Sequence, residues 1–262
     1  MRKYLFFDID GTLVPGGQEI SSLPASTVLA LKKLKEAGHF LCIATGRSQA
    51  KAYDLMKGLG FENMVSDGGY GVTINNELLG ITPMNRDDIA GLIEECDRLG
   101  FPWAIQTDNS KFRSAPDERF YEATHDTYMG TKVIPGLDPR KCPIIYKAYI
   151  VCDTGEEQKL ESLKKVTWCR YHPEYFFVEP TDKAYGIKQI MDYYHADYKD
   201  AIVFGDNNND LSMFIDDWYK VAMGNATDII KEKADLITAD IMDDGIYKAC
   251  EKLHLFDSSY GK

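Results

Sequence analysis

Apolar runs and amphipathic stretches alternate in the first part of the chain. Residues 4–9 (YLFFDI) and 39–46 (HFLCIATG) are apolar runs closed by turn residues, which is typical of short strands buried on both faces. Residues 24–38 begin with proline, repeat apolar residues at helical spacing among lysines, and end with glycine, so they predict an amphipathic helix. Residues 48–60 predict a second helix that also ends at glycine. This order predicts a parallel sheet with right-handed crossovers.

The same alternation returns between residues 201 and 253. The predicted elements are, in order, a strand (AIVFGD), a short helix (NNDLSMFIDD), a strand (YKVAMGN), a helix (ATDIIKEKA), a short strand (ADLIT) and a closing helix (DGIYKACEKL). The two ends of the chain therefore predict one α/β domain with a Rossmann-like parallel sheet.

The middle of the chain has a different pattern. Helical patterns are predicted over residues 85–100, 118–130 and 155–165, and the intervening strands are alternating or rich in aromatic residues. One pair of strands is predicted on either side of His172 and Pro173. We therefore predict an α+β domain inserted into the α/β domain, with the first domain made of residues 1–82 and 183–262 and the inserted one of residues 83–182.

Composition narrows the classes of function. The 262 residues carry 30 Lys and Arg against 41 Asp and Glu, a formal net charge of −11, which argues against nucleic acid or an anionic membrane surface as the main partner. No apolar run is long enough for a membrane span or a signal peptide, and the six cysteines contain no C-x-x-C pair. These features predict a cytoplasmic protein with reduced thiols.

Four polar clusters lie at or beside predicted strand ends, where open parallel sheets bind ligands. Each alone has an ordinary structural explanation as a turn, a helix cap or a solvated residue, and only the four together indicate a site. The clusters are Asp8-x-Asp10-Gly-Thr, Thr45-Gly46-Arg47, Lys183, and Gly205-Asp206-Asn-Asn-Asn209-Asp210.

Several carboxylates at one sheet edge repel each other unless a cation or a proton intervenes. Hard oxygen ligands of this kind suit Mg²⁺, especially where a phosphate completes its coordination shell. The sequence therefore predicts a magnesium site beside a bound phosphate.

In combination, the segments FFDIDGTLV, IATGR, Lys183 before an apolar helix, and GDNNNDLSMF resemble the haloacid dehalogenase superfamily. The segment VAMGNATDIIKEKADLIT followed by DDGI is similar to the Cof-type phosphatases of that superfamily, which carry a class IIB α+β cap domain. The resemblance covers about residues 1–82 and 183–255. It implies a Mg²⁺-dependent phosphatase in which the inserted domain is a cap that selects the substrate.

The resemblance also implies roles for individual residues. Asp8 would attack phosphorus and form an aspartyl-phosphate, while Asp10 would protonate the leaving oxygen and later activate water. Asp8, the main-chain carbonyl of Asp10, and Asp206 would hold Mg²⁺. The remaining implied roles are support of the metal by Asn209 and Asp210, and binding of the transferring phosphoryl group by Thr45, Lys183 and backbone groups around Ile9 and Gly46.

The substrate is left more open. Asp67 and Gly68, in SDGGYG, stand where the subfamily often has Asn-Gly-Ala, and they are either substrate-facing or a plain hairpin turn. Arg47 from the core, with Arg113 and His172 from the inserted domain, are further candidates for substrate binding. A small phosphorylated metabolite is expected, with sugar phosphates favoured over nucleotide-derived or cofactor phosphates. The alternatives are a phosphomutase or phosphotransferase on the same core, and a non-catalytic binding module. The oligomeric state is left open.

Overall fold

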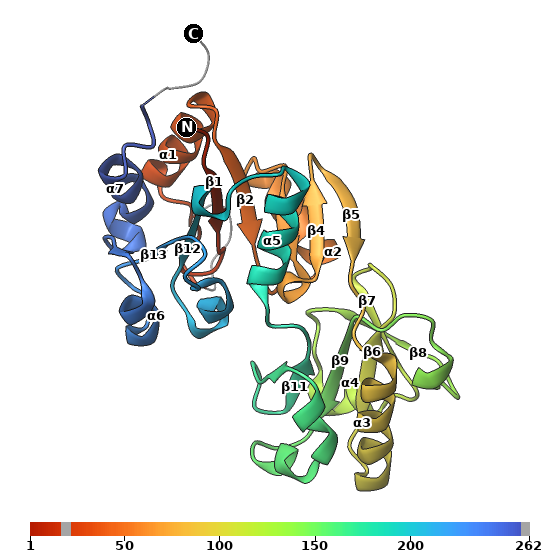
Figure 1. Cartoon of the computed structure of the whole chain (residues 1–262). Coiled ribbons are helices and arrows are strands. Elements are labelled where there is room, and N and C mark those ends of the chain that lie inside the picture. Colours follow the sequence, from red (N-terminus) through yellow and green to blue (C-terminus); the bar gives the residue numbers. More distant parts are fainter. Residues whose placement is uncertain (17–21, 258–262) are drawn as a thin grey trace. The chain divides into compact units, whose positions relative to one another are not determined.

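The computed structural model describes residues 1–16 and 22–257, and these form two compact units. The first unit comprises residues 1–47, 52–80 and 182–262, and the second comprises residues 48–51 and 81–181. Each unit contains one β-sheet (Figure 1), with buried apolar clusters on both faces. None of the helices in the described part of the chain is long and apolar enough to cross a membrane.

The first unit is an α/β domain built on an eight-stranded sheet in the order β14-β13-β12-β1-β2-β3-β4-β5. The six strands from β14 to β3 are parallel, and β4 runs antiparallel to β3. The strands are β1 (Tyr4–Phe7), β2 (Phe40–Ala44), β3 (Met64–Ser66), β4 (Gly71–Ile74), β5 (Glu77–Ile81), β12 (Ala201–Gly205), β13 (Tyr219–Ala222) and β14 (Leu236–Ile237).

Helices cover both faces of this sheet, so its central strands are buried. One core contains apolar side chains of α1, α2 and α7, and the core on the other face contains those of α5 and α6 (Figure 1). Burial on both faces explains why β1 and β2 are continuous apolar runs in the sequence. The helices are α1 (Ala25–Glu36), α2 (Gln49–Gly58), α5 (Lys183–Tyr193), α6 (Asp228–Lys233) and α7 (Gly245–Lys252).

The second unit contains a six-stranded sheet in the order β10-β11-β9-β6-β7-β8. Its strands are antiparallel except that β7 and β8 are parallel. Apolar residues of α3 pack on one face, and Phe120 of α4 packs with aromatic residues on the other. The elements are α3 (Arg86–Leu99), β6 (Trp103–Gln106), β7 (Phe112–Ala115), α4 (Arg119–Thr124), β8 (Gly130–Val133), β9 (Lys147–Val151), β10 (Trp168–Cys169) and β11 (Tyr175–Val178).

Two helix predictions in the second unit were wrong. Residues 155–165 form two 3₁₀ helices, Glu156–Lys159 and Glu161–Lys165, because Leu160 between them is extended and buried. The helix predicted over residues 118–130 is much shorter: α4 ends at Thr124, its C-cap His125 has a left-handed backbone, and the chain from Gly130 onward continues as β8. Neither stretch repeats apolar residues over enough turns to bury one helical face.

Candidate active site

Two buried aspartates follow neighbouring strands of the larger sheet. β1 and β12 are parallel, with Phe7 opposite Phe204, so Asp8 and Asp206 leave the sheet at the same edge. The backbone N–H of Asp8 donates a hydrogen bond to the Phe204 carbonyl at 3.0 Å. Both side chains are nearly inaccessible, at 3% exposure for Asp8 and 8% for Asp206. The sheet register therefore brings together two carboxylates that are distant in sequence.

Asp210 adds a third carboxylate from the 3₁₀ helix Asn208–Met213 that follows β12. Its Oδ2 accepts hydrogen bonds from the backbone N–H groups of Asp206 (2.9 Å) and Asn207 (3.1 Å). Asn207 is the N-cap of this helix and completes a capping box with Asp210. Asn is thus well accommodated at this position.

Lys183 is the first residue of α5, and its ammonium group lies among these carboxylates. Nζ is 2.6 Å from Asp8 Oδ1 and 2.6 Å from Asp210 Oδ1, and the residue is 1% exposed. Burial alone lowers the pKa of Lys183, but the charges of Asp210 and Asp8 outweigh burial and raise it above its ordinary value. Lys183 is therefore charged and holds Asp8 in place.

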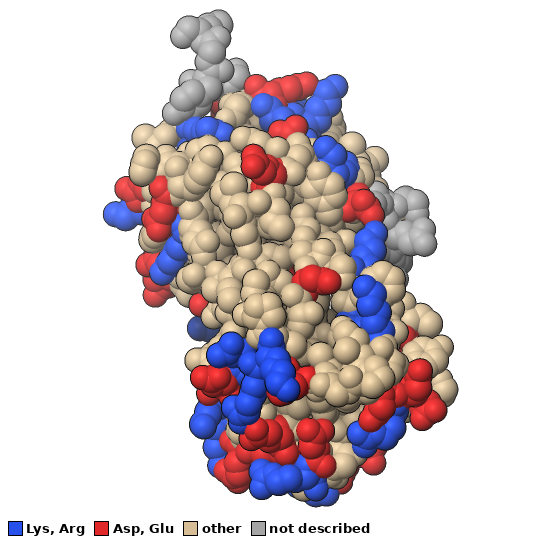
Figure 2. All heavy atoms as spheres, turned by 90° about the vertical axis from the view of Figure 1, so that its right-hand side faces the viewer, with Lys and Arg blue, Asp and Glu red and all other residues tan. Residues whose placement is uncertain are grey.

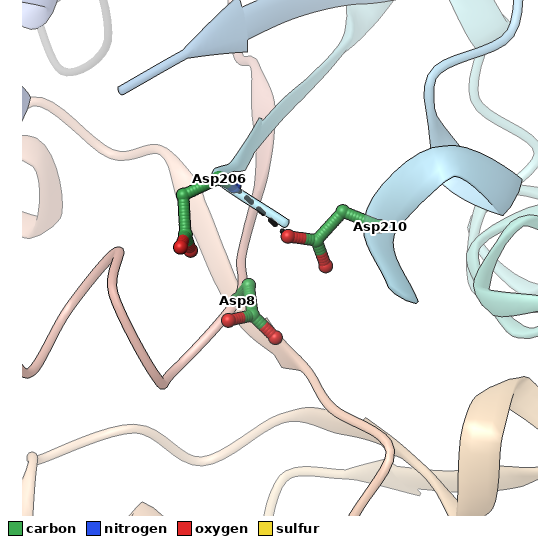
Figure 3. A group of neighbouring side chains, drawn as sticks. All are labelled: Asp8, Asp206 and Asp210. Atoms are coloured by element: carbon green, nitrogen blue, oxygen red, sulfur yellow. Dashed lines mark hydrogen bonds between the residues drawn. The ribbon is translucent and has the colours of Figure 1, made fainter. Parts of the chain in front are cut away.

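The three carboxylates lie close together (Figure 3), with one ligand oxygen from each lying within 4.8 Å of the others. Burial, followed by the charge of Asp210, raises the pKa of Asp206 to about 6. The same two causes raise the pKa of Asp8, against the opposing effect of Lys183. One ammonium group does not balance three carboxylates, so these hard oxygen donors fit a divalent cation.

On the other side of Asp8, Thr45 follows β2, the strand paired with β1. Thr45 is buried, and its hydroxyl accepts a hydrogen bond from the backbone N–H of Arg47 at 3.2 Å. The side chain of Arg47 extends to Asp10, where Nη2 lies 2.8 Å from Oδ1. Gly46, between Thr45 and Arg47, is half-buried. This loop therefore lies at the same sheet edge as the carboxylates.

The turn after β3 completes that edge. Asp67, Gly68 and Gly69 have consecutive positive φ angles of 52°, 65° and 112°. The backbone N–H of Asp67 donates to the Arg47 carbonyl at 2.8 Å, and the Gly68 carbonyl accepts from the N–H of Asp182 at 2.8 Å. The turn is thus fixed between the Arg47 loop and the residue that precedes Lys183.

The sequence model of the haloacid dehalogenase-like hydrolase family matches residues 5–250 of this chain. The chain belongs to this family. A relative in Bacillus subtilis, YkrA, is 28% identical over 266 residues, which cover 97% of this chain and 98% of YkrA.

Two solved structures have the same fold. A hypothetical protein of Geobacillus kaustophilus HTA426 has a TM-score of 0.81 at 30% identity, over 97% of this chain and 100% of that one. A subclass IIB sugar phosphatase has a TM-score of 0.74 at 25% identity, over 97% and 99% of the two chains. The comparisons confirm the predicted superfamily and fold class, and they support phosphatase activity.

The remaining candidate residues of this haloacid dehalogenase-like hydrolase are Asn209 of the first unit, and Arg113 and His172 of the second. Asn209 is exposed beside Asp210. In the second unit, Arg113 is buried, with Nη2 2.5 Å from Asp126 Oδ2, and its guanidinium lies over the Phe120 ring. His172 is exposed and stacks on Tyr175 with ring centroids 4.6 Å apart.

The predicted residue Ile9 and its near neighbour Gly11 have well-defined surroundings. Ile9, between Asp8 and Asp10, is buried, and its carbonyl accepts the N–H groups of Leu13 and Val14. Gly11 has a φ of 96°, and a Cβ there would lie 2.2 Å from Asp206 Oδ2. The glycine of the Asp-Gly-Thr segment is thus required for the close approach of Asp206.

Three further residues near the site were missed in the sequence. Thr12 is buried and its hydroxyl donates to Asp206 Oδ1 at 2.8 Å, while Ser212 Oγ accepts the backbone N–H of Lys183 at 2.9 Å. The Asn225 side chain donates to the Gly11 carbonyl at 2.8 Å. Thr12 and Asn225 belong to the DGT and MGNA segments. Membership of these segments could have marked Thr12 and Asn225 as residues near the site, but the sequence does not indicate which atoms their side chains contact.

Proposed function

We propose that this chain is a Mg²⁺-dependent phosphomonoester hydrolase that works through an aspartyl-phosphate on Asp8. The observation that carries the proposal is the buried Asp8 carboxylate, which is bonded to Lys183 and lies beside Asp206 and Asp210. Such an arrangement places a fixed anionic nucleophile next to positive charge, which phosphoryl transfer requires.

Asp8, Asp206 and the main-chain carbonyl of Asp10 would hold the cation, with Asp210 supporting it together with Asn209. When bound, Mg²⁺ would neutralise charge on the phosphoryl oxygens and on the carboxylates. Thr12 would orient Asp206 through its hydroxyl.

In the first half-reaction, an Asp8 oxygen attacks phosphorus, the bond from phosphorus to the leaving oxygen breaks, and Asp10 donates its proton to that oxygen. In the second, Asp10 takes a proton from water, which attacks phosphorus and frees Asp8 and inorganic phosphate. Lys183, Thr45 and backbone N–H groups around Ile9 and Gly46 bind the phosphoryl oxygens as negative charge shifts.

The proposed substrates are small phosphorylated metabolites, with sugar phosphates favoured. The support is the subclass IIB sugar phosphatase whose structure resembles this chain. Asp67 and Gly68 would contact the leaving group. His172, in the proposed cap over residues 83–182, would help to select it, and Arg113, buried against Asp126, would do so only by shaping the cap around it. A screen of the purified chain with Mg²⁺ against sugar, nucleotide and cofactor phosphates tests the substrate class.

Asp8→Asn tests the nucleophile. The amide keeps the size of the side chain but is a poor nucleophile, so we expect phosphate release to fall at least about 10³-fold. The circular dichroism spectrum should be unchanged. Asp153→Asn, at an exposed aspartate of the second unit, is the control and should retain full activity.

Acid quenching followed by mass spectrometry should detect one phosphoryl group on the peptide that contains Asp8 in the wild type only. Retained Mg²⁺-dependent turnover in Asp8→Asn would refute the assignment. Release of inorganic phosphate carrying ¹⁸O from labelled water distinguishes hydrolysis from transfer to a sugar hydroxyl.

A further inference from the structure

Arg47 holds the side chain of Asp10 through both carboxylate oxygens. Nη2 donates to Oδ1 at 2.8 Å and to Oδ2 at 3.0 Å, and Nε donates to Oδ2 at 3.2 Å. A guanidinium bound in this way restricts the plane and rotation of the carboxyl group, which the single ammonium of a lysine does not do.

The backbones at both ends of this contact are also fixed. The N–H of Arg47 donates to Thr45 Oγ1 at 3.2 Å, and its carbonyl accepts the N–H of Asp67 at 2.8 Å. On the other side, Asp10 forms a β-bridge with Val14, and the carbonyl of Gly11 accepts from Asn225. The pair therefore joins two loops that other contacts already hold in place.

Stability does not account for this pair. The side chains of Arg47 and Asp10 are 35% and 41% exposed, and ion pairs with that much solvent contact contribute little to folding. The pair Lys188–Asp217 in the same unit is similarly exposed, at 39% and 42%, and belongs to no candidate site. Arg47–Asp10 differs from it in its geometry and in the proposed role of Asp10.

We propose that Arg47 is a positioning residue that fixes the orientation of the Asp10 carboxyl for proton transfer to the leaving group. This inference rests on the proposed phosphatase activity. As the bond from phosphorus to the leaving oxygen breaks, the proton moves from Asp10 to that oxygen and Asp10 becomes a carboxylate.

Such a role predicts that the importance of Arg47 depends on the leaving group. An alkoxide is a poor leaving group and needs the proton, whereas p-nitrophenolate departs without it. The ratio kcat/KM covers the steps from free substrate to the transition state for leaving-group departure, when that step is the first irreversible one. Arg47 should therefore affect kcat/KM for alkyl phosphates more than for p-nitrophenyl phosphate.

The test compares wild type, Arg47→Met and Arg47→Lys on p-nitrophenyl, phenyl and glycerol phosphates with saturating Mg²⁺. For Arg47→Met we expect kcat/KM to fall about 10- to 100-fold on glycerol phosphate, which is part of the usual contribution of general acid catalysis. On p-nitrophenyl phosphate the loss should be no more than about 3-fold. Arg47→Lys should resemble Arg47→Met, because it keeps the charge but loses the two-point contact.

Two controls separate positioning from other effects. Lys188→Met removes the similarly exposed ion pair and should leave all three values unchanged. In an Asp10→Asn background, Arg47→Met should add no loss that depends on the leaving group.

An equal loss on all three esters would overturn the proposal and indicate that Arg47 binds the phosphate itself. No loss, or a selective loss that persists without the Asp10 carboxyl, would overturn it as well. Absence of Mg²⁺-dependent turnover in the wild type would instead contradict the proposed function.

Discussion

At the scale of single residues, the site is a concentration of negative charge with one lysine inside it. Lys183 contacts Asp8 and Asp210. The backbone N–H of Asp206 donates a hydrogen bond to Asp210, and the side chain of Asp206 accepts one from Thr12. Asp206 is thus oriented without a basic partner of its own in the contacts described, and burial raises its pKa to about 6. Its carboxylate is the group that a cation would stabilise most directly.

Asp206→Asn should weaken Mg²⁺ binding. A cation that binds only the folded chain stabilises it, by about 2.7 kcal/mol at a concentration 100 times its Kd. We therefore expect Mg²⁺ to raise the Tm of the wild type, and to raise the Tm of Asp206→Asn much less, in thermal denaturation with and without the ion. Asp228→Asn, an exposed aspartate in the same unit, should keep the wild-type shift. Equal shifts in all three proteins would contradict a metal site at Asp206.

The sequence allowed the carboxylates to be predicted but not their contacts. Asp8 and Asp206 could be placed because each ends an apolar run, and the ends of parallel strands share one edge. The contact of Arg47 with Asp10 depends on the paths of two loops 37 positions apart, which no local pattern encodes. The same is true of Arg113, whose guanidinium is buried against Asp126 in the interior of the second unit.

At the scale of elements, the position of α5 depends on the turn at Asp67–Gly69. The Gly68 carbonyl accepts the N–H of Asp182, and the Gly69 carbonyl lies where a Cβ on Gly186 of α5 would come within 2.5 Å. Because Gly69 and Gly186 have no side chains, the backbone of residues 67–69 packs directly against the backbone at the start of α5. Lys183 lies at this junction.

Gly69→Ala should destabilise the chain and lower its activity. The residue has a φ of 112°, and an added Cβ would lie 1.8 Å from the Asp182 carbonyl oxygen. We expect the free energy of unfolding to fall by about 2 kcal/mol or more, and kcat to fall because Asp182 and Lys183 must move. Urea denaturation and phosphatase assays measure both.

Gly80→Ala is the matched control, because no atom lies within 4 Å of its added Cβ. It should leave stability and kcat close to those of the wild type. A Gly69→Ala variant as stable as Gly80→Ala would show that the turn does not constrain α5.

Elements with strong local signals were predicted well. α3 begins after the N-cap Asn85 and ends at Gly100 in the left-handed region, as its sequence pattern indicates. β8 was missed because its pairing with β7 is set by contacts across the sheet rather than by its own sequence.

At the scale of the whole molecule, a formal net charge of −11 does not attract anionic substrates. On the face drawn in Figure 2, basic and acidic side chains are interspersed. In the proposed function, attraction for a phosphate would therefore be local, from Lys183 and the proposed cation.

His39 connects three distant segments of the first unit. Its Nδ1 accepts the backbone N–H of Lys3 at 3.0 Å, and its Nε2 lies 2.8 Å from the carbonyl of Leu255. Both contacts are satisfied by the neutral ring with the proton on Nε2. Burial, together with the positive charges of the N-terminus, Lys3 and Arg2, lowers the pKa of His39 from its usual 6.5, although the Leu255 carbonyl opposes this.

His39 should make folding less favourable in acid. Below pH 6.5 the ring is protonated in the unfolded chain but stays neutral in the folded chain. The free energy of unfolding therefore decreases as the pH falls from 6.5, until the pH is below the lowered pKa of His39. The difference in unfolding free energy between wild type and His39→Gln should shrink from pH 7.5 to pH 5. Urea titrations at both values measure it, and a difference that does not change with pH would contradict the assignment.

The hydrogen bond from Asp182 to the Gly68 carbonyl has a further consequence for how sequences of this type diverge. Asp182 is where the chain re-enters the first unit, and its side chain also caps α5 by accepting the N–H of Tyr185. A backbone shift caused by a substitution between residues 81 and 181 must pass through Asp182 before it can move Lys183 along the chain, and Asp182 is held in place by its hydrogen bonds. The inserted segment can therefore accumulate substitutions, or be exchanged for another, while the backbone at Lys183 keeps its local anchor.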